Sequence, residues 1–568
     1  MPEYLAPGVY VEETSFRAKS IEGVSTSTTA FVGPARKGPL GEAVFVSSFG
    51  DFERIFGGFE ALQFGDTSKT NYLAHGVKNY FDNGGARLFV SRVLKGDARK
   101  AMYSLKGEGD KTVNFTARTP GSGGNGQVTL ELVHTELPTD STVLLDRAPL
   151  GALMVTNTEG DTVVQTLYRK EREGWFQLPR QQDADAVDIA GLGGVKRELV
   201  SVNVLFRDEA GNEFFYENLG LAPDHPRAIH AALAETPDRA IDRLEQPYAI
   251  TGDTGEPEVL YALFAANQGK PLPIAGGSDG EEPEASDYEA ALAVLAGNDE
   301  IAIVAAPGYS DYGARKGIQE ALLKHVEARR SYRFAVLDTR RGAGLQEALQ
   351  DKSVVDSSYV ALYHPWVVVA NPQARPGERE LLLPPSGFVC GIFARNDINR
   401  SVAKSPANEV VRGAIGLERN VTLAEQEVLN PRGVNCLRFF PGRGYRVWGA
   451  RTASSDPEWK YIGPRRYFLY LEHSIDRSTQ WAVFENNGPL LWANVSEAVS
   501  SFLYNEWRSG DLLGTTPEQA FFVRCDRSTM TQNDLDNGRL VCLIGVAVLK
   551  PAEFVIFRIG QKTADARD

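Results

Sequence analysis

The sequence predicts a multidomain protein of the α/β and α+β classes, with a β-rich inserted domain and an extended strand arm at each end of the chain. Three observations predict this class. The chain has 568 residues, which is too many for one ordinary hydrophobic core. Strand and helix patterns alternate over much of its length, whereas short alternating runs separated by Gly, Asp and Pro fill residues 99–250. Apolar β-type segments lie near both ends.

The first segment, residues 1–23, contains one short strand pattern formed by Val9, Tyr10, Val11 and Glu12. Its sequence neighbours offer no hairpin partner. Because unpaired backbone amides favour the edge of another sheet, we expect this segment to act as an N-terminal strand arm.

Residues 24–98 are predicted to be the first part of an α/β core. Apolar residues at helical spacing indicate a helix over residues 72–81, and Asn83, Gly84 and Gly85 follow as residues that tolerate a left-handed C-terminal cap. Strands are predicted at residues 28–32, 43–46 and 88–93.

Residues 99–250 are predicted to be an antiparallel, β-rich surface insertion. Residues 251–385 return to α/β order as the second part of the core. Strands at residues 301–305 and 333–337 flank a helix with Ile318, Leu322 and Val326 on one face, an arrangement typical of a parallel crossover. One long strand region is expected at residues 359–369.

Residues 386–540 are predicted to be a last α/β or α+β domain. Pro489 suits the first turn of a helix that continues through Phe502 and ends near Gly510. Residues 541–568 are predicted to be a C-terminal arm and tail with two strands, residues 541–549 and 553–559. The apolar residues of the second strand are Phe554, Val555, Ile556, Phe557 and Ile559.

The totals argue against several classes of function. A net charge of −14 without a local Lys/Arg run is unsuited to binding nucleic acid. The four cysteines lie among apolar neighbours and form no C-x-x-C pair, which indicates buried free thiols. Neither a signal peptide nor an apolar run long enough to cross a membrane is expected.

Motifs for catalysis or cofactor binding are also missing from the sequence. The loop at residues 306–313 follows a strand and precedes a helix but lacks a phosphate-binding pattern. The seven histidines have no metal-ligand spacing. We therefore predict no catalytic, cofactor or metal site. Arg443, Arg446 and Arg451 cluster in one aromatic stretch and are expected to pair with carboxylates within or between subunits.

Several motifs in this order resemble those of contractile tail sheath proteins, which include the sheaths of phage tails, R-type bacteriocins and extracellular contractile injection systems. The resemblance covers parts of residues 1–98 and 251–568, and leaves out residues 99–250. Its strongest motifs are SPAN at residues 405–408, LNPRGVN at 429–435, PGRGYRVWGART at 441–452 and KPAEF at 550–554. The motif residues that we single out are Asn408, Asn435, Arg443, Trp448 and Arg451.

The resemblance implies a sheath core assembled as hexameric rings stacked helically on an inner tube protein, with baseplate and tail-terminator proteins as further partners. It implies extended termini that reach into neighbouring subunits, and contraction that drives the tube through a target cell envelope. It implies no enzyme activity and no cofactor, and assembly in a bacterial cytoplasm as part of a phage tail or contractile particle. Residues 474–486 resemble the helix that such sheaths place on the tube, so Arg477 and Gln480 are candidate tube contacts.

Two alternative functions, and an alternative interpretation of residues 474–486, remain open at this stage. The β-rich residues 99–250 could form a surface-binding module for a glycan or a cell surface, alone or as a decoration on a sheath. The α/β core could instead carry an enzyme, which would need a polar cluster at the strand ends. Residues 474–486 could likewise be an ordinary amphipathic surface helix.

Overall fold

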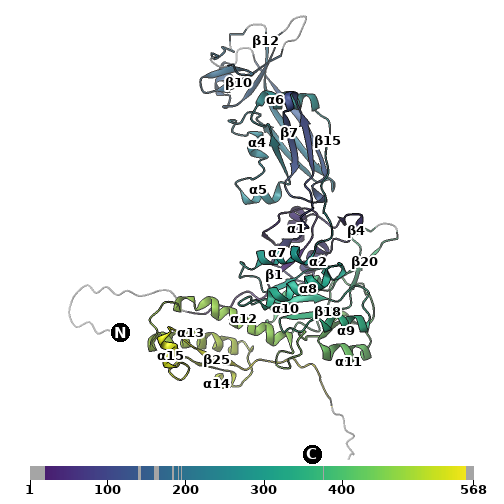
Figure 1. Ribbon diagram of the computed structural model, residues 1–568, viewed down its shortest axis with the longest axis vertical. Coiled ribbons are helices and arrows are strands. Elements are labelled where there is room, and N and C mark those ends of the chain that lie inside the picture. The colour runs from purple at the N-terminus through teal and green to yellow at the C-terminus, as the bar shows by residue number, and fades with distance from the viewer. Residues whose placement is uncertain are drawn as a thin grey trace, which may run out of the picture.

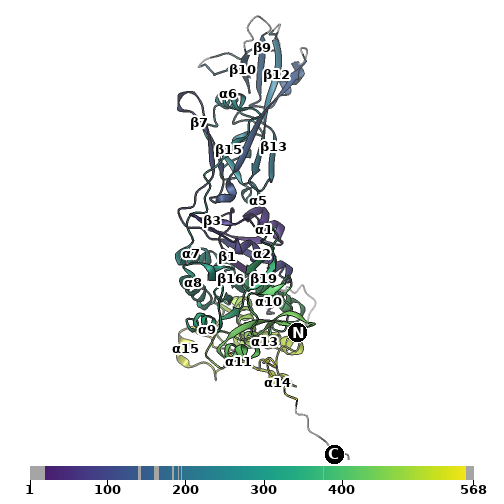
Figure 2. The same ribbon diagram turned by 90° about the vertical axis from the view of Figure 1, so that its right-hand side faces the viewer.

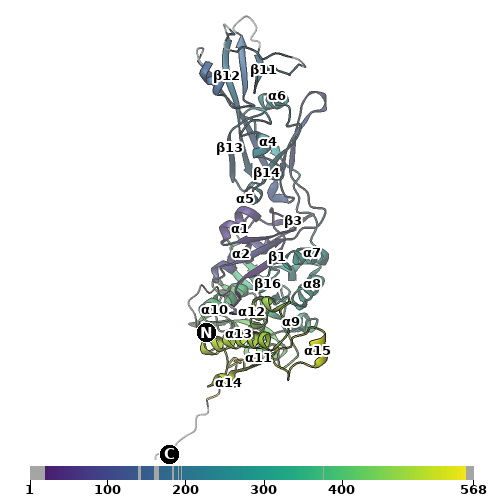
Figure 3. The same ribbon diagram turned by 90° about the vertical axis from the view of Figure 1, so that its left-hand side faces the viewer.

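The computed structural model describes residues 20–138, 142–158, 165–181, 184–189, 191–192, 195–374 and 377–557. The molecule is elongated, with a β-rich unit at one end, an α/β unit in the middle and a helical layer at the other end (Figure 1). The two side views keep this order of units (Figures 2 and 3). The fold is therefore mixed α/β with several sheets, as the sequence predicts.

An eight-stranded sheet forms the middle unit. Its inner six strands are parallel, and the two edge strands, β2 and β23, are antiparallel. In spatial order the strands are β2 (Ala43–Val46), β5 (Leu88–Arg92), β1 (Thr29–Gly33), β16 (Ile303–Ala305), β17 (Phe334–Asp338), β18 (Val360–His364), β22 (Val434–Phe440) and β23 (Gly444–Trp448).

Helices cover both faces of this sheet. Phe334 and Val336 of β17 pack in the cluster with α2 (Tyr72–Asp82) and α10 (Ser386–Asn399). Ala335 and Leu337, which point the other way, pack with the second group of helices. That group consists of α7 (Ala285–Leu295), α8 (Arg315–Glu327) and α9 (Leu345–Ser353).

The predicted core elements agree with the structure in all but one case. The helix at 72–81 and the strands at 28–32, 43–46, 88–93, 301–305 and 333–337 are confirmed within two residues. The predicted long strand at residues 359–369 is wrong, because the chain turns at Pro365. Its first part is β18 of the central sheet, and its second part, β19 (Val367–Ala370), pairs with β20 (Glu380–Leu383) and β21 (Gly416–Leu417).

The β-rich unit is built from a three-stranded and a seven-stranded sheet over one apolar cluster. Its last strand, β15 (Leu272–Ile274), pairs with β8 (Gly126–Leu137), so the unit continues past the predicted boundary at residue 250. The other strands are β6 (Met102–Lys106), β7 (Thr112–Ala117), β9 (Leu153–Thr158), β10 (Gln165–Glu171), β11 (Gly174–Leu178), β12 (Val195–Asp208), β13 (Glu213–Leu219) and β14 (Tyr248–Gly252). Its helices are α3 (Thr142–Arg147), α4 (Ile229–Ala232), α5 (Ala240–Glu245) and α6 (Pro257–Asn267).

The helical layer packs α12 (Ile462–Ser478) and α13 (Pro489–Arg508) against the two-stranded sheet of β24 (Phe521–Arg524) and β25 (Leu543–Val546). The predicted helix from Pro489 is confirmed. The expected single helix at residues 474–486 is wrong, because α12 ends at Ser478 and a short 3-10 turn, Gln480–Ala482, follows. Further elements of the chain are α1 (Phe49–Phe56), β3 (Leu62–Phe64), β4 (Thr67–Lys69), α11 (Leu423–Leu429), α14 (Pro517–Ala520) and α15 (Gln532–Asp536).

Candidate functional site

The C-terminal segment beyond Glu553 is apolar and exposed. Phe554, Val555, Ile556 and Phe557 are 71%, 68%, 78% and 83% exposed, and they pair with no strand among the described residues. The predicted strand at 553–559 is therefore not formed within the chain as far as residue 557, and Ile559 lies outside the described residues. Four consecutive exposed apolar residues are unusual in a soluble monomer and mark an interaction segment.

Glu553 anchors this segment to the body of the protein. Arg451 donates from Nε to Glu553 Oε1 at 2.8 Å and from Nη2 to Oε2 at 2.7 Å, a bidentate pair. Asn430 Nδ2 donates to Oε1 at 2.7 Å and the Tyr461 hydroxyl donates to Oε2 at 3.0 Å. Lys460 Nζ lies 3.7 Å from Oε2. The exposed segment thus begins at a carboxylate held by four side chains.

The electrostatics of this anchor favour the ionised carboxylate. Partial burial alone would raise the pKa of Glu553. Hydrogen bonds from Arg451, Asn430 and Tyr461 outweigh that effect and hold the pKa below its ordinary value. The ion pair with Arg451, which is 6% exposed, is therefore present throughout the neutral pH range.

Asn435 fixes the position of Arg451. Asn435 is fully buried in β22, and its Nδ2 donates to the Arg451 carbonyl at 2.7 Å while its Oδ1 accepts from the Arg451 amide at 2.8 Å. A second bond runs from Asn435 Nδ2 to the carbonyl of Leu362 in β18, at 3.3 Å. A Cβ on Gly449 would lie 2.8 Å from Asn435 Oδ1, so the bend before Arg451 needs glycine. The central sheet thereby orients the guanidinium that holds Glu553.

A groove of about 1150 Å³ runs beside the anchored segment. Its walls come from the loop at residues 401–408 after α10, from α11, from residues 448–451 at the end of β23, from the turn at Gly510 and from residues 549–555. Trp448 lines it at the end of β23, where its carbonyl accepts from Gln426 Nε2 at 2.6 Å and its ring lies 4.5 Å from Phe440.

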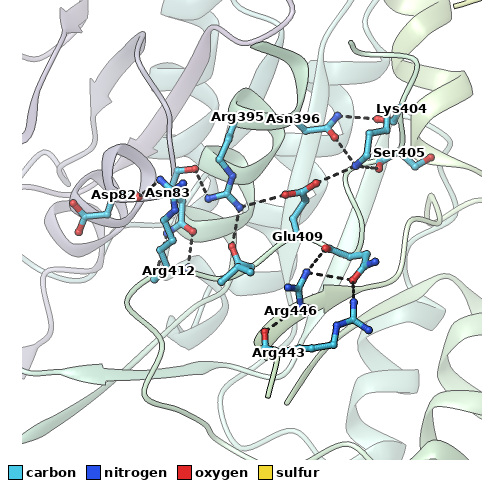
Figure 4. A network of polar contacts seen from close by, with 12 residues as sticks. Asp82, Asn83, Arg395, Asn396, Lys404, Ser405, Glu409, Arg412, Arg443 and Arg446 are labelled. Carbon is cyan, nitrogen blue, oxygen red and sulfur yellow. Dashed lines mark hydrogen bonds and ion pairs between the residues drawn. The ribbon is translucent and has the colours of Figure 1, made fainter. Parts of the chain in front are cut away.

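Asn408 forms a second cluster at the sheet edge with Arg443 and Arg446, the two arginines that Figure 4 labels there. Asn408 has φ +60°, a left-handed conformation that Asn tolerates better than most residues. Its Oδ1 accepts from Arg443 at 2.6 Å, and its carbonyl accepts from Arg446 at 2.6 Å. The guanidinium of Arg443 also lies 5.8 Å from the Trp448 ring centre.

The expectation that these arginines pair with carboxylates within or between subunits is thus confirmed within the chain for Arg451, and pairing between subunits stays a prediction for the other two. Arg443 and Arg446 meet no carboxylate among the described residues. Their bonds go to an amide and to carbonyl oxygens, because the loop at residues 405–411 lies along the edge of β23 and brings its own backbone within reach.

The same network fixes the loop to α2 and α10. Lys404 donates to Glu409 at 3.1 Å and to Asn396 Oδ1 at 2.8 Å, as Figure 4 shows. Arg395 donates to the carbonyl of Asn83 at 3.0 Å, and Asn83 Oδ1 accepts from the Arg412 amide at 2.9 Å. The loop that lines the groove is therefore held to the middle unit on both sides.

In the described part of the chain, the two-stranded sheet β24–β25 has no third strand along either outer edge, and the antiparallel bridge between Leu512 and Val548 begins only beyond β25. Each strand has the other as its only partner strand among the described residues. Phe522 and Leu543 are 48% and 52% exposed. A sheet of two strands is marginal by itself, and its outer edges can accept a further strand.

The remaining predicted site residues lie away from this cluster. Arg477 and Gln480 are exposed near the end of α12, and Gln480 Nε2 donates to Asp476 Oδ1 of the same chain at 3.1 Å. Val9, Tyr10, Val11 and Glu12 lie outside the described residues.

The strand ends of the central sheet, where an enzyme of this class would act, hold a polar cavity of about 370 Å³. Sequence reasoning did not identify the polar residues that line this cavity. Its central carboxylate, Asp338, is buried and accepts from the Ser386 amide at 2.7 Å and hydroxyl at 2.6 Å, so it caps α10. Burial raises the pKa of Asp338 to about 7. Arg340 donates from Nε to Asp351 at 2.8 Å. These charged groups are engaged in holding elements together, which favours a structural role.

The described residues lack two further features. They contain no group of three or more His, Cys, Asp or Glu side chains placed to hold a metal ion. No described helix is both long and apolar enough to cross a membrane.

In comparison with known proteins, the region that contains Arg451 and Glu553 matches two family models. Residues 281–453 match the phage tail sheath protein central domain, and residues 454–562 match the phage tail sheath C-terminal domain. A putative prophage major tail sheath protein of Pseudomonas aeruginosa is 26% identical over 182 residues, which is 31% of this chain and 45% of that protein. The tail sheath protein of Vibrio phage KVP40 is 22% identical over 218 residues, 38% of this chain and 30% of that protein. The matched region thus spans less than half the length of either relative.

Solved structures share the fold over almost the whole chain. The helical sheath of the anti-feeding prophage in its contracted state has a TM-score of 0.55 and 21% identity, with 98% of this chain and 99% of that chain covered. The sheath complex of the PVC extracellular contractile injection system has a TM-score of 0.53 and 18% identity, with 99% of each chain covered.

Proposed function

Because this chain belongs to the family of contractile tail sheath proteins, we propose that it polymerises as helically stacked hexameric rings around an inner tube. Contraction of these rings drives the tube through a target cell envelope. Baseplate and tail-terminator proteins bind the ends of the sheath. The particle is a phage tail or a related contractile system assembled in a bacterial cytoplasm.

Neighbouring subunits are linked by exchanged terminal strands in this proposal. The observation that carries it is the exposed apolar segment at residues 554–557, which follows a firmly anchored Glu553. An extended segment with free amides can gain about 1 kcal/mol net for each backbone hydrogen bond when it joins a sheet. The open edges of β24–β25 in a second copy are acceptors of the required kind.

The anchor also suits a link that survives movement of the subunits. Arg451, Asn430 and Tyr461 hold Glu553 by side-chain bonds, so force along the segment is passed to β22 and to the start of α12. The globular bodies can then rotate between two packings while the strand link stays intact. We place the tube contact at the exposed end of α12, with Arg477 and Gln480 as its residues.

Electron microscopy of the purified chain tests this function. We expect tubes with helical striation from the full chain. Deletion of residues 554–568 should leave folded, soluble subunits, whereas the control deletion of residues 563–568 should still give tubes. Tubes formed without residues 554–568 would refute strand exchange, and soluble monomers of the full chain with an enzymatic turnover would refute the sheath function.

A further inference from the structure

Cys525 and Cys542 face each other across the two-stranded sheet. Arg524, the last residue of β24, pairs with Leu543, the first residue of β25. The next residues outward in this register are the two cysteines. The two thiols are also close enough for each to influence the pKa of the other. Neither the sequence spacing nor a C-x-x-C motif reveals this pair.

The register makes the pair geometrically suited to a disulfide. The Ala547 amide donates to the Ala520 carbonyl at 2.7 Å, which marks these opposed residues as a hydrogen-bonded pair. Hydrogen-bonded and non-hydrogen-bonded pairs alternate along an antiparallel ladder, so the cysteine pair, five positions on, is non-hydrogen-bonded. Cα atoms in such pairs lie about 4.5 Å apart, within the range of about 4.4–6.8 Å that a disulfide spans.

The other two cysteines provide a contrast. Cys390 lies in α10 and Cys436 in β22, and they belong to the apolar clusters on opposite faces of the central sheet. Both are fully buried. Of the four thiols, only the pair beside β24–β25 combines a partner with partial exposure, at Cys542.

We propose that Cys525 and Cys542 form a disulfide modification site, closed by a low-molecular-weight disulfide such as oxidised glutathione. The Cys542 thiolate attacks one sulfur of oxidised glutathione and releases one glutathione thiolate. The Cys525 thiolate then attacks the Cys542 sulfur of the mixed disulfide and releases the second glutathione. The two cysteines lose two protons and two electrons, and the oxidant is reduced to two glutathione molecules.

The reaction is slow at neutral pH. Burial raises the pKa of Cys525, and burial together with the neighbouring thiol raises the pKa of Cys542 to about 12, so few thiolates are present. The pair consequently stays reduced under reducing conditions and closes over hours in an oxidising solution.

The closed disulfide staples β24 to β25 and encloses residues 526–541 in a covalent loop. A two-stranded sheet is marginal alone, so this link stabilises the sheet that we propose as the acceptor of exchanged arms. That consequence rests on the proposed function, whereas the disulfide itself rests only on the register and the closeness of the two thiols.

Mass spectrometry of the full chain tests the site. After incubation at pH 8 with oxidised glutathione and then alkylation, we expect one cross-linked peptide joining Cys525 to Cys542, and Cys390 and Cys436 alkylated after unfolding. The Cys525→Ser variant should instead carry one glutathione on Cys542. Under limited proteolysis, the oxidised wild type should be cleaved within residues 526–541 at least tenfold more slowly than the reduced protein.

Two outcomes would overturn the proposal: mixed disulfides on both cysteines without the cross-linked peptide, or free thiols at equilibrium with the oxidant. The readout requires no tubes, so a chain that failed to polymerise would still report on the disulfide. Conversely, if the disulfide forms in a chain that never forms tubes, the modification site is confirmed and the sheath function is refuted.

Discussion

Strand β17 and the segment at residues 554–557 have nearly the same kind of sequence and opposite surroundings. The four residues from Phe334 to Leu337 are fully buried, whereas Phe554 to Phe557 are 68–83% exposed. Strand β17 has β16 and β18 as neighbours and helices over both faces. The C-terminal segment has an anchor at its start and no described strand beside it.

The difference shows that an apolar β-type pattern indicates a segment that needs a partner strand, but does not indicate whether the same chain or a second copy supplies that strand. In the central sheet the partners follow within the same chain through parallel crossovers. At the C-terminus the same need is left unmet by the described residues, which is the reason for proposing that a second copy meets it.

A charge placed in each segment should separate the two cases most strongly. Val336→Asp puts a carboxylate into a fully buried strand, and we expect a loss of about 5 kcal/mol or more in the free energy of unfolding, enough to prevent folding. Ile556→Asp should change that free energy by less than about 0.5 kcal/mol and abolish tubes.

Urea denaturation of the non-polymerised chain and electron microscopy measure these two effects. Ile556→Val is the matched control, since it keeps an apolar β-branched residue and should keep the tubes. Equal destabilisation by Val336→Asp and Ile556→Asp would mean that the C-terminal segment is buried in its own subunit, and the comparison would fail.

The anchor between the two regions should give the next largest effect. Glu553→Ala leaves Arg451 buried without its carboxylate, and we expect a loss of about 3–5 kcal/mol in the free energy of unfolding. Glu553→Gln keeps an acceptor for Arg451 and should lose clearly less. The exposed Glu458→Ala serves as control and should have almost no effect. Equal stability of all three variants in urea denaturation would show that the ion pair does not hold the segment.

The sequence predicted the central sheet well because continuous apolar runs such as residues 333–337 are typical of strands buried on both faces. It missed the end of the β-rich unit because β15 is only three residues long and reads as part of the following α/β pattern. It missed the anchor because Arg451 and Glu553 are 102 positions apart, and no local periodicity connects a side chain to a partner that distant.

The pH dependence of the two regions should run in opposite directions. Burial raises the pKa of Asp338 in the central unit to about 7, from 3.8 for an aspartate exposed to solvent. Folding therefore favours its protonated form, so its contribution to stability is full below about pH 3.8 and is lost as the pH rises through 7. Glu553 has a lowered pKa, so its contribution is present above 4.5 and is lost only as the pH falls through its folded-state value.

Urea denaturation between pH 5 and pH 8 checks the first of these signs with Asp338→Asn. The wild type should lose stability relative to this variant as the pH rises towards 7, and the difference should be constant above that. Three buried histidines have lowered pKa values and therefore reduce stability as the pH falls below 6.5: His75, His325 and His364. Because the wild type and the Asp338→Asn variant share them, their effect cancels in the difference in stability. A difference independent of pH would show that Asp338 is ionised across this range.

The smallest effect concerns Asn408, whose loop borders both the central sheet and the groove beside the C-terminal segment. Asn408→Gly removes the acceptor of Arg443 but suits φ +60°, so we expect a loss of about 0.5 kcal/mol in the free energy of unfolding. Asn408→Ala removes the same acceptor and also places a Cβ in the left-handed region, which adds about 1 kcal/mol. If the free energy of unfolding in urea falls in the order wild type, Asn408→Gly, Asn408→Ala, then the additional loss in the Ala variant comes from the left-handed backbone conformation. If Ala equalled Gly, the loop would be free to relax, and the network of Figure 4 would not hold the groove wall in place.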